Sequence, residues 1–203
     1  MTQLIESQAV IPHLRASEPV PLPFARDLLI RAFVIERAGG NLLVYSTPTA
    51  HGDVWRQYLN HAHEAAFASD RVTAPLFVHA ADRAAVEQTH PVRASFSRRH
   101  MLDDDFEVIP TPGHTPGATA YLWDSGDHRV LFTGDTLFVR GGEWVAAVLD
   151  SSDRAAYRKS LELIRTLDFD VLVPWAATAG EPFHAVTDHK DTERRIDALL
   201  QRI

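Results

Sequence analysis

The chain has 203 residues, of which 45% are hydrophobic, and its formal net charge at pH 7 is −7. This length and composition suit one large domain or two small ones with ample core, and we expect one domain over residues 1–203. The negative charge argues against a nucleic-acid partner. The chain has no cysteine, so it has no disulfide and a metal site must use histidine or carboxylate ligands. We find no secretory signal and no apolar run long enough to span a membrane, and therefore expect a cytoplasmic protein without a membrane partner.

The first third of the chain predicts mainly strands. Residues 1–27 contain Pro12, Pro19, Pro21 and Pro23, which predicts an irregular N-terminal arm or short edge strands. The apolar residues 28–36 predict one strand, and the glycine-rich turn at 39–41 joins it to a second strand at 42–45. Residues 54–58 are interpreted as a helical turn.

Two histidines separated by one residue follow. His61 and His63 lie on one face if their segment is extended, so both can bind the same ion. In such a segment Glu64 points to the opposite face, where a salt bridge is its expected role unless the backbone turns there. A strand at 76–79 and a short helix at 82–88 come next.

The central stretch, residues 106–138, carries two further candidate ligands. It predicts strands at 106–109, 118–123 and 130–132, with a turn at Gly126 between the last two. His114 lies on a turn after Pro112-Gly113, and Asp135 follows glycine at the end of the third strand. Glycines at strand ends allow close approach, so both side chains are expected to converge on one zinc-like ion. The alternative is that His114 only packs in a turn and Asp135 only caps one.

The last third predicts two helices and one strand. Residues 151–153 can cap a helix that places Tyr157, Leu161, Ile164 and Leu167 on one apolar stripe. A strand is expected at 170–173. A final helix from about residue 187 has a second stripe. Strands followed by helices in each half predict layered sheets with helices outside.

The three motifs His61-Ala62-His63, PGHTPG at 112–117 and TGDTLF at 133–138 occur in an order that resembles the metallo-β-lactamase fold superfamily. The PGHTPG and GDTLF segments are most similar to its glyoxalase-II-like branch. The resemblance implies an α/β (α+β) fold, a four-layer αβ/βα sandwich with a metal site at the edge between two sheets. It also implies that His61, His63 and His114 bind one metal and that Asp135 bridges to a second.

The chain departs from this family at the second metal. Ala65 and Ala66 stand where the family motif has aspartate and histidine, and Trp175-Ala176 replaces the histidine that follows the last strand. An Asp-x-Gly turn is replaced near Tyr45. We therefore predict a degenerate site in which His61, His63, His114 and Asp135 bind one zinc, iron or manganese ion.

Two functions stay open at this point. The first is a single-metal hydrolase of a small ester, thioester or lactone, with His114 and Asp135 as catalytic residues. The second is a non-catalytic binding or scaffolding protein that holds one metal or none. If Asp135 is a fourth ligand that closes the tetrahedron, the site is structural and inert, which favours the second function. A cupin-type barrel also uses such histidines, but it needs a glutamate near Phe67 and lacks two long helices.

The expected partner is a small molecule, and the sequence indicates no particular oligomeric state. Four aromatic residues lie near the loops that border such sites: Trp55, Phe67, Trp144 and Trp175. They either form an apolar pocket wall or pack in the core.

Overall fold

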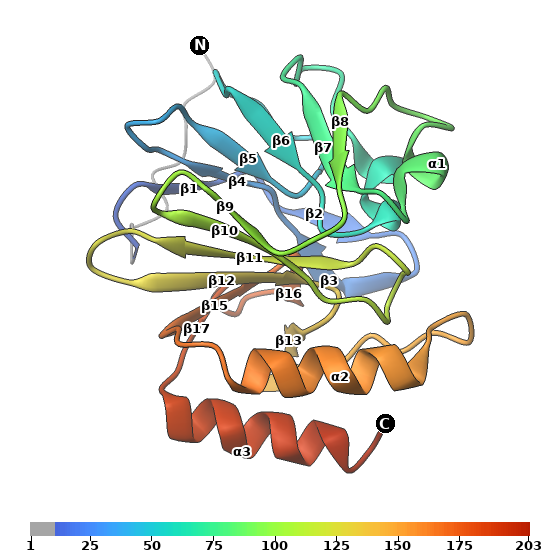
Figure 1. Ribbon diagram of the computed structural model, residues 1–203, viewed down its shortest axis with the longest axis vertical. Helices are drawn as coiled ribbons and strands as arrows, with labels where there is room; N and C mark the ends of the chain where they lie inside the picture. Colours follow the sequence, from blue (N-terminus) through green and yellow to red (C-terminus); the bar gives the residue numbers. More distant parts are fainter. Residues whose placement is uncertain (1–10) are drawn as a thin grey trace.

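Two six-stranded β-sheets pack face to face in the computed structural model, which describes residues 11–203 (Figure 1). The part of the predicted N-terminal arm at 1–10 lies outside the described residues. The first sheet has the order β1 (Leu14–Ala16), β4 (Phe33–Ile35), β5 (Leu42–Val44), β6 (Arg56–Tyr58), β7 (Leu76–His79) and β8 (Ala94–Phe96). The second has the order β17 (Ala185–Val186), β15 (Val171–Pro174), β12 (Arg129–Gly134), β11 (Thr119–Asp124), β10 (Phe106–Pro110) and β9 (His100–Leu102).

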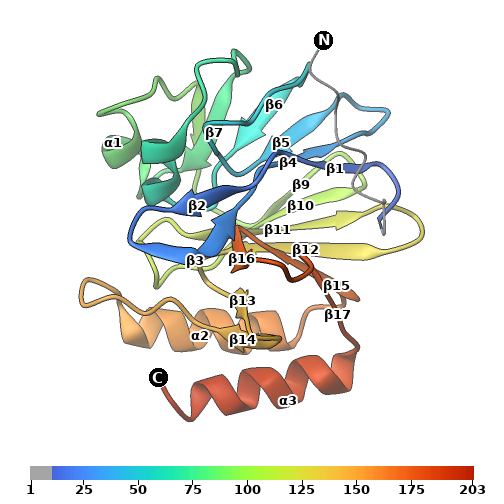
Figure 2. The same cartoon turned by 180° about the vertical axis from the view of Figure 1, so that it is seen from behind.

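A five-stranded sheet joins the two halves on the other side of the molecule (Figure 2). Its order is β14 (Glu143–Val145), β13 (Phe138–Arg140), β16 (Ala176–Thr178), β3 (Ala25–Ile30) and β2 (Val20–Leu22). Because β3 leads into β4 of the first sheet and β16 follows β15 of the second, this sheet connects strands from the beginning and the end of the fold.

The central strands of the second sheet, β10, β11, β12 and β15, are largely buried on both faces. In β11, Tyr121 and Trp123 belong to the core between the two large sheets, whereas Ala120 and Leu122 belong to the core under the C-terminal helices. Alternate side chains therefore serve two different cores, which explains why the sequence of β11 is almost continuously apolar.

The helices form the outer layers. On one side, α2 (Arg154–Arg165) covers the second sheet and α3 (His189–Leu200) packs against α2 (Figure 1). Asp153 and Asp188 cap these helices by accepting hydrogen bonds from Ala156 N and Asp191 N. On the other side, the 3₁₀ helix η1 (Ala62–Phe67) and α1 (Arg83–Val86) cover a smaller core with β7. This layering confirms the predicted αβ/βα sandwich.

Several expectations for the N-terminal half are corrected. The strand predicted at 28–36 is two strands in different sheets, because the chain leaves β3 at Ile30 and enters β4 at Phe33. The helical turn predicted at 54–58 is wrong: this segment forms β6, which pairs in parallel with β5 and β7. The short strands β1 and β2 lie at sheet edges, as predicted for the proline-rich arm. No helix among residues 11–203 is long and apolar enough to cross a membrane.

Candidate metal centre

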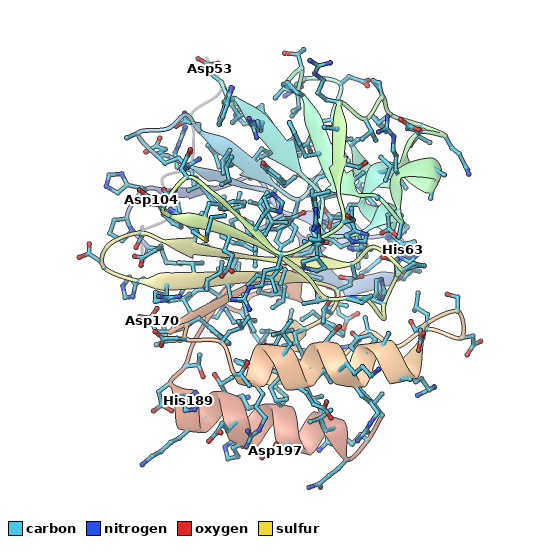
Figure 3. The ribbon with its side chains drawn as sticks, in the orientation of Figure 1. Asp53, His63, Asp104, Asp170, His189 and Asp197 are labelled. Carbon is cyan, nitrogen blue, oxygen red and sulfur yellow. The ribbon has the colours of Figure 1, made fainter. Side chains whose placement is uncertain are left out.

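Three histidines from two loops meet at one end of the sandwich. His61 and His63 lie at the start of η1, and His114 lies on the turn between β10 and β11. Their ligand atoms all lie within 4.8 Å of one another. Figure 3 shows His63 on the right-hand side of the molecule, with Asp104 and Asp170 on the left. The structure thus brings together the three histidines that the sequence singled out.

The distances in this cluster suit a tetrahedral ion. His63 Nδ1 lies 3.1 Å from His114 Nε2. Asp135 Oδ2 lies 3.6 Å from His61 Nε2 and 3.6 Å from His114 Nε2. Two nitrogen ligands about 2.0–2.1 Å from zinc are about 3.3 Å apart, so these spacings match a shared ion. His61 Nε2 is buried without a hydrogen-bond partner, and an ion would satisfy it.

Neighbouring oxygens orient two of the imidazole rings. His114 Nδ1 lies 2.6 Å from the carbonyl oxygen of Ala147, so Nδ1–H donates there and the Nε2 lone pair faces the cluster. His61 Nδ1 lies 3.1 Å from both Asn60 Oδ1 and Glu64 Oε1. These contacts leave the Nε2 atoms of both rings available as ligands.

Burial keeps the imidazoles neutral, which is the form that binds metals. Burial lowers the pKa of His61 to about 3, although the Asp135 carboxylate acts in the opposite direction. Burial also lowers the pKa values of His63 and His114. Burial raises the pKa of Asp135, and the neighbouring His61 offsets part of this increase.

Glu64 lies where the sequence did not place it. The backbone turns into η1 directly after His61, so the extended segment is wrong, and Glu64 does not point to the opposite face: its Oε1 lies 3.1 Å from His61 Nδ1. Glu64 is fully buried, and its Oε1 accepts hydrogen bonds from Asn60 N at 2.9 Å and His61 N at 3.2 Å. Burial raises the pKa of its carboxyl group well above the usual range. Glu64 therefore fixes the backbone of His61 through these hydrogen bonds.

Asp82 holds the two histidine loops together, a role that the sequence did not reveal. Its carboxylate accepts hydrogen bonds from Ala62 N (2.9 Å) in the His61–His63 loop and from Thr115 Oγ1 (2.6 Å) and Gly117 N (2.8 Å) in the His114 turn. Asp82 precedes α1, yet its side chain does not cap that helix. The sequence indicated only a short helix at 82–88, because the partners of the Asp82 side chain lie 20 to 35 residues away.

Two glycines allow the loops to approach. Gly113 has a φ of 146°, and a Cβ there would overlap the backbone of Tyr157 at the start of α2. Gly134 has a φ of 55°, and a Cβ there would overlap the side chain of Asn60. Any larger residue at these sites would push His114 or Asp135 away from the cluster.

Comparison with known proteins agrees with this site. The sequence profile described as "Metallo-beta-lactamase superfamily" matches residues 27–176. The chain belongs to the metallo-beta-lactamase superfamily. It is 50% identical over 44 residues to a hydroxyacylglutathione hydrolase of Erwinia tasmaniensis, which covers 22% of this chain and 16% of that protein. It is 38% identical over 80 residues to a hydroxyacylglutathione hydrolase of Shewanella baltica, covering 37% of this chain and 27% of that protein.

Solved metallo-beta-lactamase structures share the fold. The subclass B3 enzyme of Bradyrhizobium japonicum superposes with a TM-score of 0.63 at 17% identity, covering 94% of this chain and 89% of that chain. A family protein of Thermus thermophilus gives a TM-score of 0.62 at 18% identity, with 96% and 80% covered. The predicted membership and fold are confirmed, while the curated relatives are matched over only 16–28% of their length.

This metallo-beta-lactamase superfamily member has hydrocarbon where second-metal ligands were expected. Ala65 packs in the small core under η1, whereas Ala66 and Ala176 line a cavity beside the histidines. The Trp175 indole N–H donates to Ser46 O at 2.9 Å, and its ring contacts His61 edge-on at 5.5 Å. None of these positions offers a ligand atom.

Tyr45 occupies the expected Asp-x-Gly turn. It has a φ of 71° and is fully buried. Its hydroxyl donates to Val173 O at 2.7 Å and accepts from Gly134 N at 2.8 Å. A phenol that ties together the ends of β12 and β15 therefore replaces an acidic turn. His51, His79 and His184 stay outside the cluster among the described residues.

A cavity of about 630 Å³ opens beside the cluster. Its polar lining residues are His63, His114 and Asp135, and its walls are apolar. Of the four aromatic residues singled out above, Phe67 and Trp175 line the cavity. Trp144 packs in the core under α2, and Trp55 is partly exposed elsewhere.

Proposed function

We propose that the protein is a single-metal hydrolase of a small ester, thioester or lactone. In this candidate His61, His63 and His114 would hold one zinc, iron or manganese ion with one position left open, and Asp135 would lie beside that position. One observation carries the proposal: three neutral imidazoles and one carboxylate converge at ligand spacing on the edge of a cavity large enough for a small molecule.

The relatives support hydrolysis of this class of bond. The curated relatives are named hydroxyacylglutathione hydrolases. A structural neighbour described as a dizinc quorum-quenching lactonase has a TM-score of 0.54 at 12% identity, covering 79% of this chain and 76% of that chain. We transfer the reaction class only, because the first group is matched over short segments and the second shares only the fold.

In this proposal the chain's own residues position the reactants. A bound ion of this kind supplies polarisation of a carbonyl and acidifies water. The contact of His114 with Ala147 O and those of His61 with Asn60 and Glu64 hold two rings in fixed orientations. Asp135 lines the cavity, and we assign its Oδ2 as the acceptor of a proton from the attacking water. Burial raises the pKa of this partly buried carboxyl, which suits a proton acceptor better than the lower pKa of an exposed aspartate would.

The second candidate is a non-catalytic, metal-containing binding protein. Asp135 Oδ2 lies at the same distance, 3.6 Å, from His61 Nε2 and His114 Nε2, so it is placed to complete a closed set of four ligands. A closed tetrahedral site leaves no position for substrate or water. Ala65 adds to this argument, since the family places an acidic side chain there.

Hydrolysis assays with zinc-, iron- and manganese-loaded protein separate the two candidates. A panel of esters, thioesters and lactones should reveal turnover that His114→Ala abolishes with little change in fold. His51→Ala is the matched control, since His51 is an exposed histidine outside the cluster. Absence of turnover with all three metals, together with small-molecule binding that survives in His114→Ala, would support the binding protein instead.

A further inference from the structure

We infer that the cavity beside the histidines binds the uncharged hydrocarbon chain of the substrate, so that the preferred substrate is a neutral alkyl or acyl ester, thioester or lactone. This inference rests on the proposed hydrolase and adds its substrate class. The residues that replace second-metal ligands, Ala66 and Ala176, form part of the cavity wall. The side of the site without ligands is thus available to the non-reacting part of a substrate.

The wall is built from apolar side chains of separate elements. The β2–β3 hairpin contributes Leu22, Phe24 and Leu28, and η1 contributes Phe67. Trp175 closes the wall from the end of β15. Its ring is held by the indole hydrogen bond to Ser46 O and lies 5.3 Å from the Phe67 ring in an edge-on contact. Such a wall favours a ligand that exchanges water for hydrocarbon contact.

Part of this apolar lining is exposed to solvent. Phe24 is 82% exposed and Leu149 is 41% exposed, although both are large hydrophobic residues. Large exposed side chains that gather around one cavity indicate a binding surface rather than isolated surface residues. A hydrocarbon chain in the cavity would cover them and recover the hydrophobic free energy that they now forgo.

Charge argues against an anionic substrate. No lysine or arginine is among the described residues that line the cavity, and the ionisable groups there are His63, His114 and Asp135. The chain also carries a formal net charge of −7. A glutathione thioester, the substrate type named for the curated relatives, brings carboxylates that would find no cation in this cavity.

Equilibrium binding of a homologous series tests this inference independently of turnover. The probes are n-alkyl methyl ketones of increasing chain length, compared with carboxylates of the same lengths. Titrations use the full chain, both zinc-loaded and after treatment with chelator. The dissociation constant of the ketones should fall roughly fourfold per methylene until the cavity is filled, as about 0.8 kcal/mol per buried methylene requires. In the chelator-treated protein the carboxylates should bind at least tenfold more weakly than the ketones.

Two variants locate the binding in the cavity. Ala66→Asp places a carboxylate in the wall at an exposed position of η1 and should weaken ketone binding at least tenfold. Phe24→Ala removes an exposed ring and should weaken binding severalfold, and it serves alone if Ala66→Asp does not fold. Trp55→Ala is the matched control, because Trp55 is a partly exposed aromatic residue outside the cavity. It should leave binding unchanged.

The outcomes separate this inference from the proposed function. Affinity that is independent of chain length, carboxylates that bind as tightly as ketones, or a Phe24→Ala variant equal to wild type would overturn the inference. If hydrolysis occurs with no chain-length preference in KM, the hydrolase stands and the apolar subsite falls. Chain-length-dependent binding without hydrolysis under any metal would keep the apolar site and remove the hydrolase.

Discussion

The two sides of the candidate metal centre are built from different materials. On one side, His61, His63 and His114 gather with Asp135, and further polar groups hold them in place. On the other side, Ala66, Ala176 and Trp175 offer only hydrocarbon surface to the cavity. Both sides belong to one site, yet only one of them has the chemistry to bind an ion.

The supporting contacts differ in the same way. Asp82 connects the two histidine loops, and Glu64 lies behind His61, so the polar side retains buried groups whose contacts serve the ligands. On the apolar side, the polar atoms of Tyr45 and Trp175 donate hydrogen bonds to backbone carbonyls. These two residues therefore contribute aromatic rings and no ligand atom. A site that was merely decaying would leave unsatisfied groups on both sides. The contrast is the pattern expected if one half was rebuilt as a wall while the other kept its ligand side chains.

Removing a ligand from the polar side should have the largest effect. Zinc at about a thousand times its dissociation constant should stabilise wild-type protein by about 4 kcal/mol, because it binds the folded state. In His114→Ala this gain should vanish, as one of the three clustered imidazoles is gone. Urea unfolding with and without zinc measures the gain, and His51→Ala should retain it. Full zinc stabilisation in His114→Ala would show that the histidine cluster is not the site.

The loop connection through Asp82 should produce the next largest effect. Asp82→Ala leaves two backbone N–H groups and the Thr115 hydroxyl without their acceptor, which should cost about 3 kcal/mol of unfolding free energy in metal-free protein. It should also weaken zinc binding, measured by competition with a chelator.

Glu87→Ala is the control for this change. Glu87 forms an exposed ion pair with Arg83, which should contribute less than about 0.5 kcal/mol. If Asp82→Ala were no more disruptive than Glu87→Ala, the two histidine loops would be positioned by other contacts.

The pH dependence of metal-free protein sharpens the comparison further. Burial lowers the pKa of His61 from 6.5 in the unfolded chain to about 3, so the native state binds fewer protons than the unfolded state between these values. The stability that neutral His61 contributes is therefore complete above pH 6.5 and is lost as the pH falls. The loss between pH 7.5 and 5 should be about 2 kcal/mol.

Comparison with His61→Gln isolates this contribution. Burial raises the pKa values of Glu64 and Asp135, and these groups contribute to pH dependence in the opposite direction. The difference in unfolding free energy between wild type and His61→Gln should therefore shrink as the pH falls from 7.5 to 5. A difference that stays constant would mean that His61 is accessible to protons in the folded state.

Returning one ligand to the apolar side should have the smallest effect. Ala66→His restores one imidazole, but Ala65 and Ala176 still supply no partner for it. Zinc content should stay at about one ion per chain, and the exposed position should keep the stability change within about 0.5 kcal/mol. A second bound ion in this variant would show that the apolar side is closer to a working metal site than its residues indicate.

Much of this arrangement is readable in the sequence. Strands such as β11 and the helix α2 follow from apolar spacing, and His114 and Asp135 are marked by the glycines beside them. Local pattern and short motifs carry this information because each depends on neighbouring residues.

The rest depends on contacts between distant segments. The split between β3 and β4 arises because each half pairs with a different sheet, which an apolar run does not reveal. The buried position of Glu64 depends on η1, a short 3₁₀ helix with no clear sequence signal. The partners of Asp82 are equally invisible, since they come from two loops that meet only in the folded chain.

The metal content of the protein tests the central claim most directly. Plasma mass spectrometry on protein purified without added metal or chelator, repeated after reconstitution with excess zinc, counts the ions per chain. Because only the polar side of the site offers ligands, we expect about one ion per chain. We expect this ion to be lost in His114→Ala. Two ions per chain would contradict the claim that the apolar side offers no ligands. No ion even after reconstitution would contradict the claim that the polar side binds a metal.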